Sequence, residues 1–222
     1  MPRQNRVDPW GDLHAVPDRG MFTGNRGCLV DDDRRLVRHH MSNLWITCLT
    51  EYRGWRFPLD APHRWTPLFF LDEAVALAAG HRPCAECRRA DYLAYKEAVA
   101  AGPDGLDRPW ASTLNRRLAA ERLRRGSGIH RGSDRLTWRA DVADLPDGAV
   151  VIDNGTAQLV LGNTLLAFSF AGWHDPTPHP TRGQIDVLTP PTSVLALRLG
   201  YRPRLRETAF APGSQSATAK NP

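Results

Sequence analysis

Four cysteines are the residues of this 222-residue chain whose types and spacing most directly suggest chemistry. Cys84 and Cys87 form a C-x-x-C pair inside the segment RPCAECR, residues 82–88. Two intervening residues allow both thiolates to reach one zinc ion, since zinc–sulfur bonds are about 2.3 Å long. Cys28 and Cys48 could supply the other two ligands of a closed tetrahedral site. The pattern therefore predicts one structural Zn²⁺ held by Cys28, Cys48, Cys84 and Cys87.

Three alternatives to a four-cysteine zinc site stay open. His63 or His81 could replace one cysteine in a three-cysteine, one-histidine site. Two disulfides would use the same four cysteines, but a reducing cytosol disfavours them. A thioredoxin-type redox pair needs a strand before Cys84, where the sequence predicts a helix.

We expect a cytoplasmic protein with no membrane partner, because no apolar run approaches the roughly 20 residues of a membrane span and residues 1–6 begin no signal peptide.

A zinc-dependent nucleobase or nucleoside deaminase is the alternative from another functional class. Such enzymes carry Pro-Cys-x-x-Cys and an upstream His-x-Glu or Cys-x-Glu, whose glutamate exchanges protons with a zinc-bound water. Residues 83–87 fit the first part, and Cys48-Leu49-Thr50-Glu51 resembles the second with its glutamate one residue too far. A deaminase would also place a strand, not a helix, before Pro83. Both departures disfavour this function.

Arginine supplies nearly all of the positive charge. The net charge is +5, and Lys96 and Lys220 are the only lysines. A planar guanidinium binds phosphates and base edges well, although a GC-rich genome produces the same bias without any functional demand. We expect a nucleic-acid partner, DNA more than RNA. The arginines predicted to contact it flank the cysteine pair or belong to a predicted helix: Arg82, Arg88, Arg89, Arg116, Arg117, Arg124 and Arg125.

The cysteines need secondary structure that brings them together. Residues 1–27 are polar and show no clear period, which predicts an irregular N-terminal segment. Residues 44–52 are rich in aromatic and β-branched side chains and predict a strand carrying Cys48, followed by a second strand ending at Phe57. A short strand is expected at 67–70. Three helices are predicted to follow, at 72–80, from 84 or 85 to 100, and at 111–125.

The second half of the chain is predicted to be β-rich. Asn-Gly and Asp-Gly turns indicate an antiparallel meander, with strands at 135–140, 149–152, 158–161, 165–170 and 185–188. A proline-rich loop is expected at 173–183, a short helix at 192–199 and a disordered tail at 209–222. The expected class is α+β, with a zinc-bound α/β region at 1–126 and a small antiparallel β-rich region at 130–208.

Residues 69–74 (FFLDEA) and 79–89 (AGHRPCAECRR) together resemble the second half of the Ada-type zinc-binding module. That family orders an aromatic pair, a short alanine-rich helix, glycine, an aromatic, Arg-Pro-Cys, two residues, cysteine and a basic residue. The resemblance implies zinc held by four cysteines and a DNA-binding role in repair or processing. The family places its first ligand pair close together, whereas nineteen residues separate Cys28 from Cys48 here. The methyl-acceptor activity of some members does not transfer, and the sequence identifies no catalytic residue.

Overall fold

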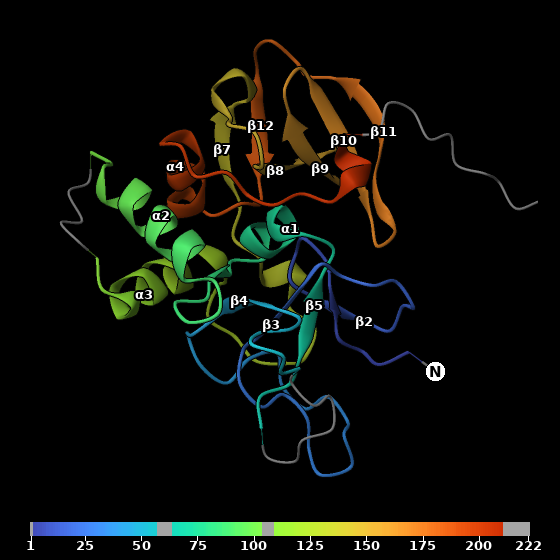
Figure 1. Ribbon diagram of the computed structural model, residues 1–222. Coiled ribbons are helices and arrows are strands. Elements are labelled where there is room, and N and C mark those ends of the chain that lie inside the picture. The colour runs from blue at the N-terminus through green and yellow to red at the C-terminus, as the bar shows by residue number, and fades with distance from the viewer. Residues whose placement is uncertain (1, 57–63, 104–108, 211–222) are drawn as a thin grey trace, which may run out of the picture.

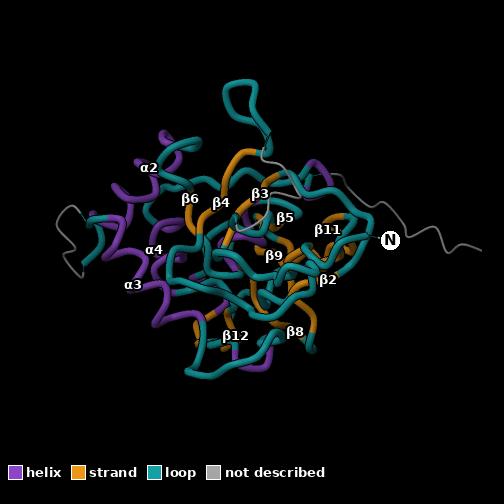
Figure 2. Tube along the Cα trace, turned by 90° about the horizontal axis from the view of Figure 1, so that it is seen from below, coloured by secondary structure: helices purple, strands orange, loops and turns teal. Residues whose placement is uncertain are grey.

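The computed structural model describes residues 2–56, 64–103 and 109–210. The chain forms two six-stranded sheets, and one short helix, α1 (Glu73–Ala78), lies between them (Figure 1). Three further helices, α2 (Arg89–Ala100), α3 (Ala111–Arg122) and α4 (Pro191–Arg198), gather at one side of the molecule (Figure 2). This arrangement confirms the α+β class predicted from the sequence.

The first sheet runs in the order β2-β1-β5-β3-β4-β6. Its strands are β1 (Arg6–Val7), β2 (Leu13–His14), β3 (Phe22–Asn25), β4 (Ile46–Leu49), β5 (Leu68–Phe70) and β6 (Arg82–Pro83). β1 pairs with β5 and β4 with β6 in parallel, and the other neighbours are antiparallel. The strands expected at 44–52 and 67–70 are present, while Phe57 lies outside the described residues. The expectation of an irregular segment at 1–27 is wrong, because strands this short leave no readable period.

The second sheet is antiparallel throughout and runs in the order β11-β10-β9-β8-β12-β7. Its strands are β7 (Trp138–Asp141), β8 (Val150–Asp153), β9 (Thr156–Leu161), β10 (Thr164–Ser169), β11 (Gly172–Pro178) and β12 (Gln184–Val187). They confirm the predicted antiparallel β-rich region. The loop expected at 173–183 is wrong, because β11 occupies most of it. Pro176 and Pro178 are tolerated there since β11 is an edge strand.

Local sequence signals set both ends of α1. The carboxylate of Asp72 accepts a hydrogen bond from the backbone N–H of Val75 at 3.1 Å, so Asp72 caps the helix as predicted. Gly80 follows the helix with a φ of +86°, in the left-handed region that favours glycine. A helix of six residues therefore has a well-defined start and stop.

The other helices differ from prediction mainly at their ends. α2 begins at Arg89, later than expected, because residues 85–88, which include Cys87, form a turn. α3 ends at Arg122 rather than 125, because Leu123 is extended and bridges to Arg135. α4 agrees with the helix expected at 192–199 to within one residue at each end. Residues 211–222 of the predicted tail lie outside the described residues.

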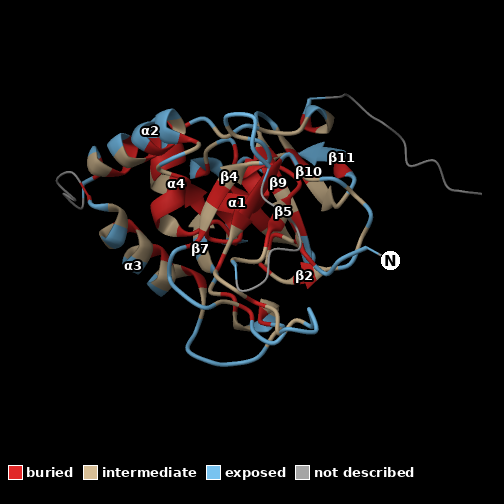
Figure 3. Ribbon diagram, turned by 60° about the horizontal axis from the view of Figure 1, so that its bottom comes forward, coloured by how far each residue is buried: buried red, intermediate tan, exposed pale blue. Residues whose placement is uncertain are grey.

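The core joins the two halves of the chain. Every residue of α1 is buried (Figure 3), and this helix contacts both β5 of the first sheet and β8 of the second. One hydrophobic cluster packs Phe22 and Phe70 of the first sheet with Leu159 and Trp173 of the second. A second cluster joins α2 and α3 to β8, β9 and α4. In the described part of the chain, packing therefore shows no break at the boundary predicted near residues 126–130.

Asp72 gives the fold a dependence on pH. Its buried carboxylate accepts hydrogen bonds from the indole N–H of Trp173 at 2.6 Å and the backbone N–H of Arg206 at 3.1 Å. Burial raises the pKa of Asp72 from 3.8 to about 6, although these hydrogen bonds oppose the rise. The folded protein thus binds this proton more tightly than the unfolded chain. The stabilising contribution is complete below pH 3.8 and is lost as the pH rises to about 6.

We expect Asp72→Asn to remove this pH dependence. The free energy of unfolding would be measured for both proteins by urea denaturation, from below pH 3.8 to above pH 6. The free energy of unfolding of the unmodified protein, minus that of the variant, should fall by about 3 kcal/mol as the pH rises across that interval. A difference that stays constant with pH would show that folding leaves the pKa of Asp72 unchanged.

Candidate metal centre

Cys48, Cys84 and Cys87 form a group whose sulfur atoms all lie within 4.8 Å of one another. Sulfurs bound to one tetrahedral zinc ion are about 3.8 Å apart, given bonds of about 2.3 Å. Cys84 is buried, and the other two cysteines are half-buried. The structure therefore shows three cysteines that could hold one metal ion.

Strand pairing brings these cysteines together. β4 and β6 are parallel, and Thr47 lies opposite Pro83. The next residue along each of these neighbouring segments is a cysteine, so Cys48 and Cys84 lie side by side. The N–H of Cys84 donates to the carbonyl of Thr47 at 2.9 Å, which continues the pairing by one residue. The turn at 85–88 then brings Cys87 back toward the other two. The sheet thus fixes two sulfurs and the turn fixes the third.

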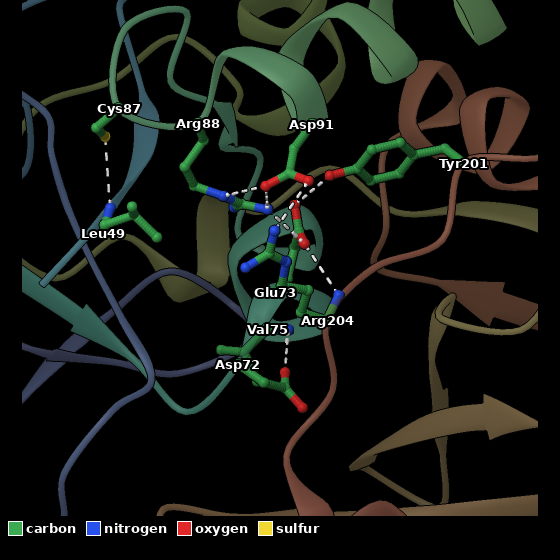
Figure 4. Close-up of polar contacts among 9 residues, drawn as sticks. All are labelled: Leu49, Asp72, Glu73, Val75, Cys87, Arg88, Asp91, Tyr201 and Arg204. Atoms are coloured by element: carbon green, nitrogen blue, oxygen red, sulfur yellow. Dashed lines mark hydrogen bonds and ion pairs between the residues drawn. The ribbon is translucent and has the colours of Figure 1, made fainter. Parts of the chain in front are cut away.

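Backbone N–H groups point at two of the sulfurs. Leu49 donates to the sulfur of Cys87 at 3.4 Å (Figure 4), and Glu86 donates to the sulfur of Cys84 at 3.4 Å. Hydrogen bonds from the Cys48 and Cys87 thiols are the main cause that lowers the pKa of Cys84, and the N–H of Glu86 adds to this effect. The thiolate is the form that binds metals. The hydrogen bonds with Cys84 and Cys87 raise the pKa of Cys48, and the pKa of Cys87 is raised as well. The feature that fits a metal ion that binds sulfur is therefore the set of three neighbouring sulfurs, with Cys84 as the thiolate among them.

Cys28 lies outside this group. In the antiparallel pair of β3 and β4, Cys48 is opposite Thr23, and β3 runs away from that point before the chain reaches Cys28. The Cys28 thiol donates instead to the carbonyl of Val30 at 3.5 Å. Among the residues described, the structure thus brings together three of the four predicted ligands.

The histidine alternatives are not supported by the described residues. His81 belongs to no metal-binding group there. It is fully buried, and its Nε2 accepts a hydrogen bond from the Nε of Arg26 at 3.3 Å. The rings of Trp45 and Phe70 also contact it, with centroids 5.0 and 4.6 Å away. His81 is therefore a core residue, while His63 lies outside the described part of the chain.

Arg88 anchors the cysteine turn to α1. Its Nη2 lies 2.7 Å from a carboxylate oxygen of Glu73 and 2.9 Å from one of Asp91, and its side chain is fully buried (Figure 4). Glu73 also accepts hydrogen bonds from the hydroxyl of Tyr201 and from the backbone N–H of Arg204, the latter at 3.0 Å. Sequence analysis does not identify Glu73, because an acidic residue in the first turn of a helix is ordinary.

The structure corrects the assignment of Arg82 and Arg88 to a nucleic-acid surface. Arg82 is only 2% exposed, and its Nε donates to the side chain of Asn115 at 2.8 Å. Its guanidinium lies over the ring of Tyr92, 5.1 Å from the centroid. Arg88 is held by the carboxylates of Glu73 and Asp91. Both arginines stabilise the fold, and neither reaches a partner from the surface.

The remaining predicted arginines are more accessible. Arg89, Arg116, Arg124 and Arg125 are exposed. Arg117 is partly buried and pairs with Glu121 one helical turn away, at 3.2 Å. Contact between these arginines and nucleic acid stays a prediction.

Two observations bear on the deaminase alternative. The expectation that a helix leads directly into Pro83 is wrong, because β6 precedes Cys84. The strand before Cys84 also removes the argument against a thioredoxin-type redox pair, which requires a strand at that position. Glu51, the residue that would transfer protons, is about half exposed and forms an ion pair with Arg56 at 2.7 Å. The strand is compatible with a deaminase, but the surface ion pair of Glu51 does not favour one.

Comparisons with protein-family models, with curated proteins and with solved structures found no match to this chain. The likeness to the Ada-type module therefore rests on residues 69–89 alone. No helix in the described part of the chain is long and apolar enough to cross a membrane. The structure provides two observations that do not depend on this likeness: the group of three cysteines, and the core that positions it.

Proposed function

We propose that Cys48, Cys84 and Cys87 hold one Zn²⁺ with a structural role. The observation that carries this proposal is the mutual distance of their sulfurs, all within 4.8 Å. Thiolates suit zinc, whereas Mg²⁺ and Ca²⁺ prefer oxygen ligands. The backbone N–H groups of Leu49 and Glu86 support bound thiolates by offsetting their charge. The ion would tie the end of β4 to the start of α2, and its binding energy would add to the folding energy.

The proposed partner of this zinc-stabilised fold is nucleic acid, DNA more than RNA, in repair or processing. The net charge of +5 and the exposed arginines Arg89, Arg116, Arg124 and Arg125 support attraction to phosphates. The resemblance of residues 69–89 to the Ada-type module supports DNA. Because Arg82 and Arg88 are buried, the proposed contact surface is smaller than the sequence suggests.

Metal analysis and binding measurements test the two parts separately. Purified protein should contain close to one zinc per chain, and a metal-free protein with readily alkylated thiols would exclude the zinc site. Duplex and single-stranded oligonucleotides should bind with an affinity that falls steeply as salt rises, because phosphate contacts release counterions. Absence of binding at low salt would exclude the nucleic-acid partner and leave the zinc site unaffected.

A deaminase remains the second candidate because three cysteine ligands leave one zinc position for water, as in catalytic sites. That function needs a carboxylate beside the metal, and Glu51 is the candidate in the sequence. Assays on free nucleosides and on single-stranded DNA, compared between the unmodified protein and Glu51→Ala, test it. Deamination that disappears in the variant would support this candidate, and its absence in the unmodified, zinc-loaded protein would exclude it.

A further inference from the structure

A pocket of about 330 Å³ opens beside the C-terminal end of α3. Four arginines line it, Arg122, Arg124, Arg125 and Arg131, and His40 forms part of another wall. No aspartate or glutamate is among the described residues that line it. Its volume falls at the lower end of the roughly 300–1,000 Å³ of small-molecule sites. We call it the arginine pocket.

Two of its arginines are buried and fixed. The guanidinium of Arg122 donates to the carbonyls of Gly80 at 3.1 Å and Asn43 at 3.2 Å. Arg131 donates to the carboxylate of Asp134 at 2.9 Å and to the carbonyl of Arg124 at 2.6 Å. These contacts hold positive charge in place before any ligand arrives, so little conformational entropy is lost on binding.

Further positive charge lies behind the pocket. Arg26 and Arg122 both stack on Trp45, 4.0 and 3.7 Å from its ring centroid. The buried Arg135 donates to the carbonyl of Arg122 at 2.7 Å. In the described residues, Arg26, Arg122 and Arg135 bond to carbonyls and histidine rather than to carboxylates. Burial lowers the pKa of all three, to about 9 for Arg26 and Arg135 and well below its ordinary value for Arg122, where the charges of Arg26 and Arg135 add to the effect. Guanidinium groups stay protonated in folded proteins, so all three carry positive charge at neutral pH.

The two remaining arginines stand at the mouth of the pocket. Arg124 and Arg125 are exposed, and neither side chain has a hydrogen-bond or ion-pair partner among the described residues. The backbone of Arg124 is fixed, because its N–H donates to the carbonyl of Asp134 at 3.0 Å. Their guanidinium groups are therefore free to close on an anion.

We propose that the arginine pocket binds the terminal phosphate of a nucleic-acid strand. Asp134 offsets the charge of Arg131, which leaves Arg122, Arg124 and Arg125 without a carboxylate partner among the described residues. A terminal phosphate carries a charge of about −1.5 to −2 at neutral pH, compared with about −1 for an internal phosphodiester, and so matches these three charges better. A concave pocket accepts a strand end, and its volume leaves room for more than the phosphate alone. Paired guanidinium N–H groups bind phosphate oxygens in a bidentate manner. The inference rests on the proposed nucleic-acid partner and specifies which part of that partner is recognised.

The test uses one single-stranded sequence prepared with a 5′ phosphate, with a 3′ phosphate, or with neither. Fluorescence anisotropy with the full-length protein should show about tenfold tighter binding of at least one phosphorylated form. The double variant R124A/R125A should lose this preference. The double variant R89A/R116A, which removes the same charge elsewhere, should bind all three strands more weakly and keep the preference. Circular dichroism confirms that both variants remain folded.

The possible outcomes separate the two proposals. Equal binding of all three strands overturns the terminal-phosphate inference while the nucleic-acid partner stands, whereas no binding of any strand overturns both. Inorganic phosphate serves as competitor. If it displaces the phosphorylated strand at concentrations close to the dissociation constant of that strand, free phosphate is the ligand instead. The ring NMR signals of His40, but not those of His174 on β11, should shift when the phosphorylated strand is added. Unchanged His40 signals would place the binding site elsewhere.

Discussion

Replacing Cys84 with serine is expected to abolish metal binding and to lower the free energy of unfolding by about 3 kcal/mol or more. Cys84 is the buried member of the group, and its sulfur accepts the N–H of Glu86. A serine hydroxyl is a poor zinc ligand, and two remaining thiols hold the metal weakly. Zinc content after gel filtration and urea denaturation with and without a chelator would measure both effects.

Cys28→Ser is the matched control, because Cys28 is the one cysteine outside the group. We expect its zinc content to equal that of the unmodified protein and its stability to change little. If Cys28→Ser lost zinc as completely as Cys84→Ser, Cys28 would be a fourth ligand, and the chain around it would have to move on metal binding. The pair of variants therefore decides between three and four protein ligands.

Glu73→Gln should destabilise the protein by about 3 kcal/mol, the lower end of the range for breaking a buried ion pair, because Arg88 keeps only Asp91 as a carboxylate partner. Glu73 and Arg88 are both buried, with 2.7 Å between their charged atoms. The carboxylate also accepts hydrogen bonds from Tyr201 and Arg204, so its loss weakens contacts across the two halves of the chain. Urea denaturation of zinc-loaded protein would measure the change.

An exposed ion pair provides the control for this experiment. Glu51→Gln removes the partner of Arg56, where Arg56 is largely exposed and Glu51 about half exposed, and should change stability by less than about 1 kcal/mol. The double variant E73Q/R88M removes both buried charges and should recover part of the loss seen in E73Q. A single-variant loss no larger than that of Glu51→Gln would contradict the role assigned to the buried pair.

Local signals account for the features that the sequence predicts well. Asp72 and Gly80 mark the ends of α1 because capping and left-handed backbone depend on the residues themselves. Cys84 and Cys87 come together because two residues separate them. The strand carrying Cys48 follows from its β-branched and aromatic composition. Each of these confirmed features depends on a few neighbouring residues, although two equally local predictions, a loop at 173–183 and a helix leading directly into Pro83, are wrong.

Long-range pairing decides the features that the sequence does not predict. Cys28 fails to join the group because the antiparallel register of β3 and β4 places Thr23, not Cys28, beside Cys48. Arg88 is buried because it forms a buried ion pair with Glu73, fifteen positions earlier in the chain. Nothing in the composition of residues 111–125 shows that Arg122 is buried while Arg124 and Arg125 face solvent. These outcomes depend on which strands become neighbours, and a single sequence does not fix that choice.

The contacts between α1 and the C-terminal segment also bear on when the protein can fold in a cell. Glu73 bonds to the backbone of Arg204, 131 positions later, and Asp72 bonds to that of Arg206. A ribosome adding about 5–20 residues per second needs roughly 7–26 seconds to synthesise the intervening chain. During that time the carboxylates that start α1 lack these partners, and its apolar face lacks the second sheet. Completion of this core therefore waits for the synthesis of residues 204–206, and until then the N-terminal half lacks the contacts that bury α1.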